Sequence, residues 1–113
     1  MNRNNVFSII DGLDVGKDTF AISGRDLGIK QRKNFKLDEK DKDSNQYVFV
    51  VADNIRVISV SFFLGMFGDS VRAYKNKDEF LKKYVFKTNG LVDKYINDGI
   101  QQALSPSLME VYK

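Results

Sequence analysis

The longest apolar stretch of the chain, residues 47–52, begins a pattern that predicts a strand followed by a helix. Its sequence, YVFVVA, is continuous and rich in β-branched and aromatic residues, which is typical of a strand buried on both faces. After a short polar step, apolar residues recur at the spacing of one helix face, at Phe63, Met66, Phe67, Val71 and Tyr74. Residues 47–74 therefore predict a strand, a loop and an amphipathic helix.

Shorter apolar segments on either side of this unit predict the remaining elements. Residues 6–10, 19–22 and 84–88 are candidate strands, and the second is a candidate partner for the first. A helix capped by Ser23 is expected through residue 37, with Leu27 and Phe35 facing inward, although a strand also fits the spacing. Another helix is expected from residue 91 until Pro106, with Gly99 on its apolar stripe allowing close approach to a neighbour.

The order of these elements predicts an α/β fold. Helices that follow strands imply crossover connections, and hence a mixed or parallel sheet of about four strands packed with about three helices. The 113 residues are expected to form one domain, with its core in residues 6–104. The tail, residues 105–113, is expected to dock through Leu108, Met109 and Val111 or to contact a second copy. The stretch of mixed charge at residues 38–46 is expected to be a solvated loop.

The composition excludes more chemistry than any motif suggests. The chain has no cysteine and no histidine, which excludes thiolate nucleophiles, disulfides, Cys or His metal sites and imidazole acid–base pairs. Because no phosphate-binding loop or acidic cluster is evident either, we expect no catalysis, no cofactor and no metal. No apolar run approaches the ~18 residues of a membrane span. We therefore expect a cytoplasmic protein that does not bind membranes.

The first candidate site is the loop and helix start at residues 53–68. Asp53 directly follows the central strand, and one of Ser59 and Ser61 is expected to cap the helix. Phe62 and Leu64 lie off the main apolar stripe, so we expect them to form an exposed apolar patch, which is typical of an interface. The expected partner-binding residues are Asp53, Ser59, Ser61, Phe62 and Gly65.

The second candidate site is a basic stretch in the first predicted helix. Its charges are Arg25, Lys30, Arg32, Lys33 and Lys36, and the chain carries a net charge of +3. The alternative function is therefore a nucleic-acid accessory protein that contacts phosphates through these residues. The other interpretation, a solvated helix face, is favoured because no aromatic platform or glycine-rich loop accompanies the charges.

Three runs, FAISGRDLGIKQRKNF, YVFVVADNIRVISVSFFLGMFGDSV and YVFKTNGLVDKYINDGIQQAL, resemble the STAS-like domain family of unknown function found in bacteria and their phages. The resemblance extends more distantly to anti-sigma factor antagonists and covers residues 19–104. The matching positions are Ser23, Gly24, Arg25, Asp53, Ser59, Ser61, Phe62, Phe67 and Gly68.

This resemblance implies a small regulatory α/β domain without catalysis of its own, which acts with a histidine-kinase-like ATPase. In the antagonists, the partner kinase phosphorylates a serine at the helix start. The resemblance therefore makes Ser59 and Ser61 candidates for phosphorylation. Here Val60 separates the two serines, and this spacing departs from the antagonist pattern.

Overall fold

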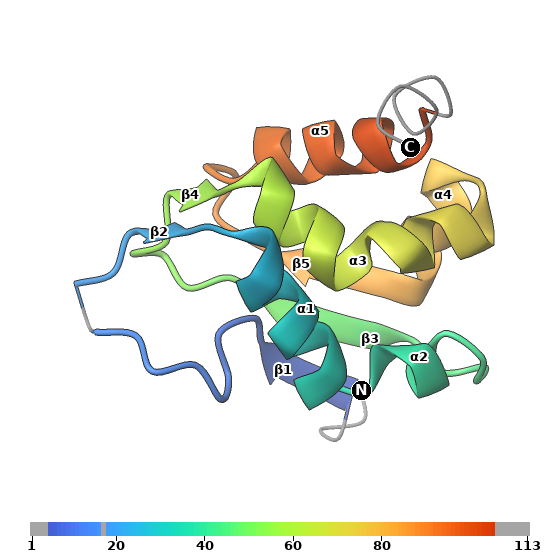
Figure 1. Cartoon of the computed structure of the whole chain (residues 1–113), viewed down its shortest axis with the longest axis horizontal. Helices are drawn as coiled ribbons and strands as arrows, with labels where there is room; N and C mark the ends of the chain where they lie inside the picture. The colour runs from blue at the N-terminus through green and yellow to red at the C-terminus, as the bar shows by residue number, and fades with distance from the viewer. Residues whose placement is uncertain (1–4, 17, 106–113) are drawn as a thin grey trace.

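Pairs of strands are followed by pairs of helices along most of the chain in the computed structural model, which describes residues 5–16 and 18–105 (Figure 1). The elements are β1 (Val6–Ser8), β2 (Ala21–Ile22), α1 (Arg25–Asn34), α2 (Leu37–Lys40), β3 (Tyr47–Val50), β4 (Val57–Ile58), α3 (Val60–Tyr74), α4 (Lys77–Lys83), β5 (Tyr84–Lys87) and α5 (Asp93–Ala103). The predicted α/β class is confirmed. The described residues form five strands and five helices, which is more than the predicted number of each.

The main sheet is parallel and has three strands in the order β1-β3-β5. Val48 of β3 pairs with Val6 of β1 and with Val85 of β5. Tyr47, Val48 and Phe49 are all buried, which confirms the prediction of a central strand with both faces covered.

A second, two-stranded sheet joins β2 to β4, and this differs from the predicted pairing of residues 19–22 with the first strand. Ala21 pairs with Val57, and the carbonyl oxygen of Phe20 accepts hydrogen bonds from the N–H groups of Arg56 and Val57. The predicted pairing is wrong because β1 pairs with β3, while the chain that follows β1 leads to the starts of α1 and α3 (Figure 1).

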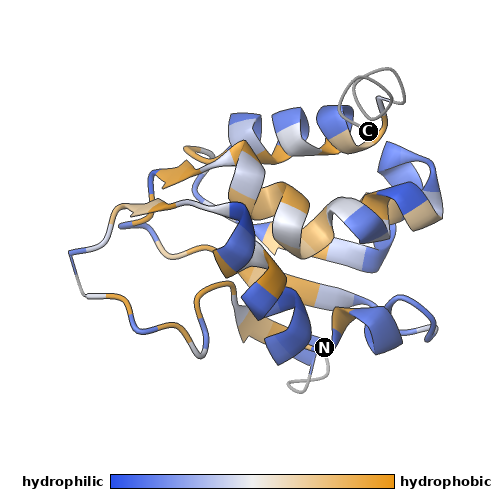
Figure 2. Ribbon diagram, in the orientation of Figure 1, coloured by the Kyte–Doolittle hydropathy of each residue, from blue (hydrophilic) through white to orange (hydrophobic). Residues whose placement is uncertain are grey.

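Helices α1, α3 and α5 lie side by side over the main sheet, with α3 in the middle (Figure 1). Figure 2 shows that α3 is the most hydrophobic of the three. The rings of Phe49 in β3 and Phe67 in α3 pack edge to face at 5.3 Å between centroids. Gly99 of α5 is buried, and a Cβ there would overlap the ring of Phe63, so the predicted close approach of this helix is confirmed.

The first helix is shorter than predicted and begins differently. The residue before α1 is Gly24, with φ of 102°, and no side chain caps this helix, so the expected cap by Ser23 is wrong. The helix ends at Asn34 because Lys36 adopts a left-handed conformation, with φ of 55°, before α2 begins. Leu27 is half-buried and packs against the core, and Phe35 is buried, as predicted.

Candidate functional site

Ser59 fixes the start of α3 and also contacts the start of α1. Its hydroxyl oxygen accepts a hydrogen bond from the N–H of Phe62 at 3.0 Å, which confirms that one of the two serines caps the helix. The same oxygen accepts from the N–H of Gly24 at 3.3 Å. Ser61, by contrast, is exposed on the first turn of α3. The two candidate serines therefore differ, since only the hydroxyl of Ser59 caps the helix.

The expected apolar patch at Phe62 and Leu64 does not form. Phe62 is fully buried, and Leu64 is half-buried against the core. The prediction is wrong because α3 is the middle helix of three and also covers the sheet, so its apolar surface extends almost all the way round. In the folded domain, Phe62 belongs to the core and is not a surface for a partner.

Gly65 is also inaccessible, because α1 and α3 are in close contact at this position. A Cβ at Gly65 would overlap the carbonyl oxygen of Arg25 and lie 3.0 Å from the nitrogen of Ile29. Reciprocally, a Cβ at Gly28 would overlap the carbonyl oxygen of Phe62. The two glycines therefore allow close backbone contact between the helices, and a partner has no access there.

The remaining residues of the first candidate site are exposed. Asp53 lies in the loop that follows β3, and Arg56 directly precedes β4. The amide of Asn54 donates to the carbonyl oxygen of Thr19 at 2.8 Å, so this loop is joined to the segment before β2. Of the expected partner-binding residues, Asp53 and Ser61 are therefore accessible on the surface, whereas Phe62 and Gly65 are buried.

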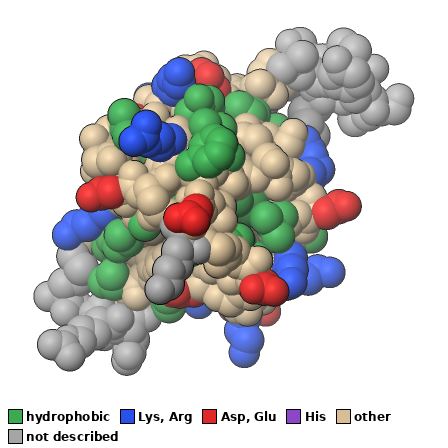
Figure 3. All heavy atoms as spheres, turned by 90° about the vertical axis from the view of Figure 1, so that its left-hand side faces the viewer, with side chains coloured by type: hydrophobic (Ala, Val, Ile, Leu, Met, Phe, Trp, Pro, Cys, Tyr) green, Lys and Arg blue, Asp and Glu red, His purple; other side chains and the backbone are tan. Residues whose placement is uncertain are grey.

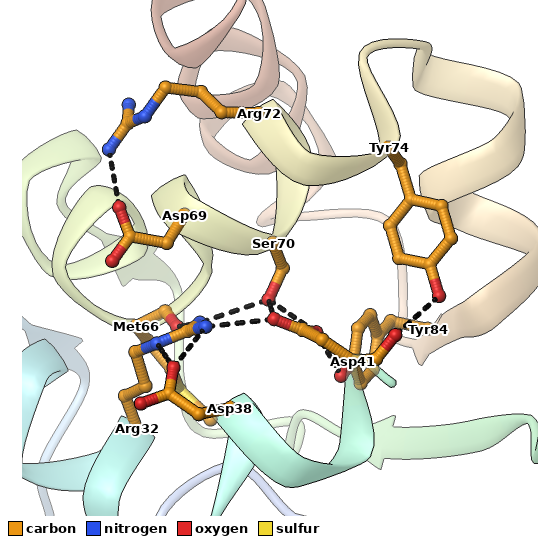
Figure 4. Close-up of polar contacts among 9 residues, drawn as sticks. All are labelled: Arg32, Asp38, Asp41, Met66, Asp69, Ser70, Arg72, Tyr74 and Tyr84. Carbon is orange, nitrogen blue, oxygen red and sulfur yellow. Dashed lines mark hydrogen bonds and ion pairs between the residues drawn. The ribbon is translucent and has the colours of Figure 1, made fainter. Parts of the chain in front are cut away.

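The basic residues of the second candidate site also differ in their exposure. Arg25, Lys30, Lys33 and Lys36 are exposed, whereas Arg32 is buried. The guanidinium of Arg32 points into the interior between α1, α2 and α3 (Figure 4). It therefore does not contribute to a phosphate-contacting surface in this conformation.

Arg32 is the centre of a polar network at the amino-terminal ends of β3 and β5 (Figure 4). It donates to the carbonyl oxygen of Met66 and to the hydroxyl of Ser70, both at 2.9 Å. It also forms ion pairs with Asp38 at 2.7 Å and with Asp41 at 2.8 Å. The network thus joins α1 to α3 and to the segment after α2.

Asp41 is the shared acceptor of this network. Its carboxylate accepts from Arg32, from the hydroxyl of Ser70 at 2.7 Å and from the hydroxyl of Tyr84 at 2.5 Å. The side chain of Asp41 is only 12% exposed. We expected residues 38–46 to be a solvated loop, and residues 42–46 are indeed exposed outside the helices and strands. The expectation is wrong for residues 38–41, because α2 extends to Lys40 and Asp41 is the partner of three donors from three other elements.

The pKa values in and beside the network follow from burial and from these hydrogen bonds. Burial, reinforced by the hydrogen bond to Asp41, raises the pKa of the Tyr84 phenol. Burial opposes the charge on Arg32, but its bonds to Asp41 and Asp38 outweigh burial and raise its pKa. At neighbouring Asp43, burial is likewise outweighed, and hydrogen bonds from Lys83 and Tyr47 lower its pKa to about 2.

The network contains polar residues that the sequence patterns did not identify. Ser70 lies four residues after Met66, on the buried side of α3, and a polar residue at such a position requires an internal partner. A serine on the apolar side of a predicted helix is therefore the sequence signal that could have identified the network. Every buried side-chain nitrogen and oxygen in the described part of the chain has a hydrogen-bond partner. The hydrogen bonds and ion pairs of the network therefore hold α1, α3 and β5 together around Asp41.

Two exposed apolar side chains lie in the segments that connect strands of the main sheet to the next element. Phe20, directly before β2, is 61% exposed, and Leu91, shortly after β5, is 50% exposed. Figure 3 views the molecule from the side of β2 and β4 and shows hydrophobic side chains among charged ones on this face. We define the end face as Phe20, Asp53, Arg56, Ser61 and Leu91, all of which are exposed.

Together these elements define an α/β domain. None of its described helices combines the length and apolarity needed to cross a membrane. Residues 5–16 and 18–105 contain no group of three acidic side chains placed to share a metal ion. No family model, curated protein or solved structure matches the chain.

Proposed function

We propose that this protein is a non-catalytic regulatory module that binds a protein partner through the end face. In open α/β folds, ligands bind beyond the carboxyl ends of the strands. Four residues of the end face lie in segments that follow strands of the main sheet, namely Phe20, Asp53, Arg56 and Leu91, whereas Ser61 lies in the first turn of α3. The proposal keeps Asp53 and Ser61 from the sequence-based site. It replaces the buried Phe62 and Gly65 with Phe20, Arg56 and Leu91.

The observation that carries this proposal is the exposure of Phe20 on a fixed backbone. Its carbonyl oxygen accepts from Arg56 at 2.7 Å and from Val57 at 3.1 Å, so the residue belongs to an ordered segment. Exposed aromatic side chains are enriched at the centres of protein interfaces, because they bury a large area and lose little conformational entropy. Arg56 next to it supplies a charge for the rim of such an interface.

The resemblance to STAS-like domains supports a kinase-type ATPase as the partner, with a serine as the switch. Ser61 is the better candidate for phosphorylation because its side chain is exposed, whereas the hydroxyl of Ser59 already accepts from two backbone N–H groups. A phosphate on Ser61 would lie in the first turn of α3, where the helix dipole favours negative charge. It would also add a double negative charge to the end face.

Co-purification from the native host tests the protein-binding proposal. We expect tagged wild-type protein to recover a specific partner and the Phe20→Asp variant to lose it. Ile29→Asp is the matched control, because it places the same charge at another exposed apolar side chain, 38% exposed on α1. Equal recovery of the partner by Phe20→Asp and the wild type would contradict the proposal.

Intact-mass measurement after incubation with a recovered kinase tests the switch separately. We expect one added phosphate on the wild type and on Ser59→Ala, and none on Ser61→Ala. An unchanged mass of the wild type would reject phosphorylation while leaving partner binding through the end face intact.

The alternative, nucleic-acid binding by the basic residues, receives less support. Arg32 is buried, and the exposed Lys33 and Lys36 line the same surface depression as Asp38 and Glu39. These acids weaken the positive field that would attract phosphates. A salt-dependent complex with DNA or RNA that is lost on charge reversal at Lys30 and Lys33 would favour this alternative.

A further inference from the structure

A groove lies along the outer edge of β5, between α4 and α5. Leu81 of α4, Val85 and Phe86 of β5, and Ile96 and Asn97 of α5 line it, together with Asp93. The lining is mainly apolar, and Val85 and Phe86 are both only half-buried. The groove therefore combines an apolar surface with the edge of a strand.

The backbone of β5 is available for pairing on this outer side. β5 is the last strand of the main sheet, and among the described residues its partner is β3 alone. The N–H of Val51 donates to the carbonyl oxygen of Lys87, so residues 85 and 87 direct their backbone groups towards β3. The alternation of a strand then directs the N–H and C=O of Phe86 outward, into the groove.

The direction in which the main sheet grows indicates where a further strand would pair. The crossovers from β1 to β3 and from β3 to β5 each move one strand in the same direction. The chain then enters α5, which packs beside α3 and is drawn above β5 in Figure 1. A third crossover of the same kind would bring the chain that follows α5 to the free edge of β5.

We propose that this groove is a strand-binding site and that residues 108–112 of the same chain occupy it, parallel to β5. This segment, LMEVY, lies outside the described residues, as does the earlier expectation that the tail docks through Leu108, Met109 and Val111. Residues 105–107 would form the connection, within the usual span of about 2–6 residues between a helix and the next strand. Four of the five residues in the segment are apolar or aromatic, which matches the apolar groove.

Amide hydrogen exchange at Phe86, measured by NMR in the 113-residue protein, tests this proposal. We expect the Phe86 amide to be protected, and to exchange on the order of 10-fold faster in the Val111→Asp variant, because the added strand is lost. The amides of Val85 and Lys87, directed towards β3, are internal references whose exchange should not change. Lys113→Gln is the control, since it changes the net charge by the same one unit outside the proposed strand.

Two results would overturn the proposal. The first is identical exchange at Phe86 in the wild type and in Val111→Asp, which would show that the edge is not covered by this segment. The second is protection of Phe86 that increases with protein concentration, which would show that a second copy covers the edge.

Discussion

The contact between α1 and α3 leads to a sharp prediction for Gly65→Ala. A Cβ at Gly65 would meet two backbone atoms of α1, the carbonyl oxygen of Arg25 and the nitrogen of Ile29. Neither atom can move away by rotating a side chain. The substitution therefore requires the two helices to separate, and this disturbs the core between them.

The magnitude follows from two opposing effects. Replacing glycine by alanine within a helix stabilises it by about 1 kcal/mol, whereas overpacking costs about 1–3 kcal/mol or more where the backbone must shift. Because the contact at Gly65 is between two backbones, we expect the second effect to dominate. The expected net loss is about 1–3 kcal/mol in the free energy of unfolding, or a melting temperature lower by roughly 4–12 °C.

Gly68→Ala on the same helix is the matched control. Its Cβ would meet the guanidinium of Arg72 at 3.1 Å, which is the end of a flexible side chain and can move away. We expect this variant to be as stable as the wild type, or more stable by up to about 1 kcal/mol. Urea unfolding followed by circular dichroism measures both variants. Equal stability of Gly65→Ala and Gly68→Ala would refute the close helix contact and make the Gly65 surface accessible to a partner again.

Three further predictions concern the same region and the polar network. Ser59→Ala should lower the free energy of unfolding by about 1–2 kcal/mol, because the cap and the contact with the start of α1 are both lost, and Ser59→Thr should restore most of it in urea unfolding. Phe62→Glu should abolish the cooperative thermal transition, because it places a charge in the core; a folded variant with native circular dichroism would show that Phe62 is accessible after all. At alkaline pH, the unfolded chain releases the Tyr84 proton above about pH 10 while the folded protein retains it, so the free energy of unfolding should fall by about 1.4 kcal/mol per pH unit. Burial also raises the pKa of Tyr47 and of Tyr74, which makes the fall in the free energy of unfolding with pH steeper. The Tyr84→Phe variant should show a shallower fall, and an unchanged slope in that variant would contradict the raised pKa of Tyr84.

Periodicity predicted the elements whose apolar pattern is strong. The strand at residues 47–50, the helices Val60–Tyr74 and Asp93–Ala103 and the contact at Gly99 agree with the sequence-based expectations. It did not predict where α1 ends, because that depends on the left-handed conformation of Lys36, a residue type that gives no such signal. It also missed β4, which has two residues and is defined by its pairing with β2.

The candidate site was harder to predict than the fold, because exposure depends on how many neighbours a helix has. Phe62 lies off the main stripe of α3 and would be exposed if only one side of that helix were covered. Similarly, Arg32 and Asp41 look like surface charges in the sequence. The side chain of Asp41 is mostly buried because α3 and β5 bring Ser70 and Tyr84 to it from 29 and 43 residues away in the sequence, and such long-range contacts leave no local pattern.

The central claim is that a partner binds through the end face, and the affinity of the purified partner tests it most directly. Titration calorimetry with the wild type, Phe20→Asp and Ile29→Asp should show a dissociation constant increased by about 30-fold or more for Phe20→Asp. We expect Ile29→Asp to differ from the wild type by no more than about threefold. A dissociation constant for Phe20→Asp equal to that of the wild type would contradict the account.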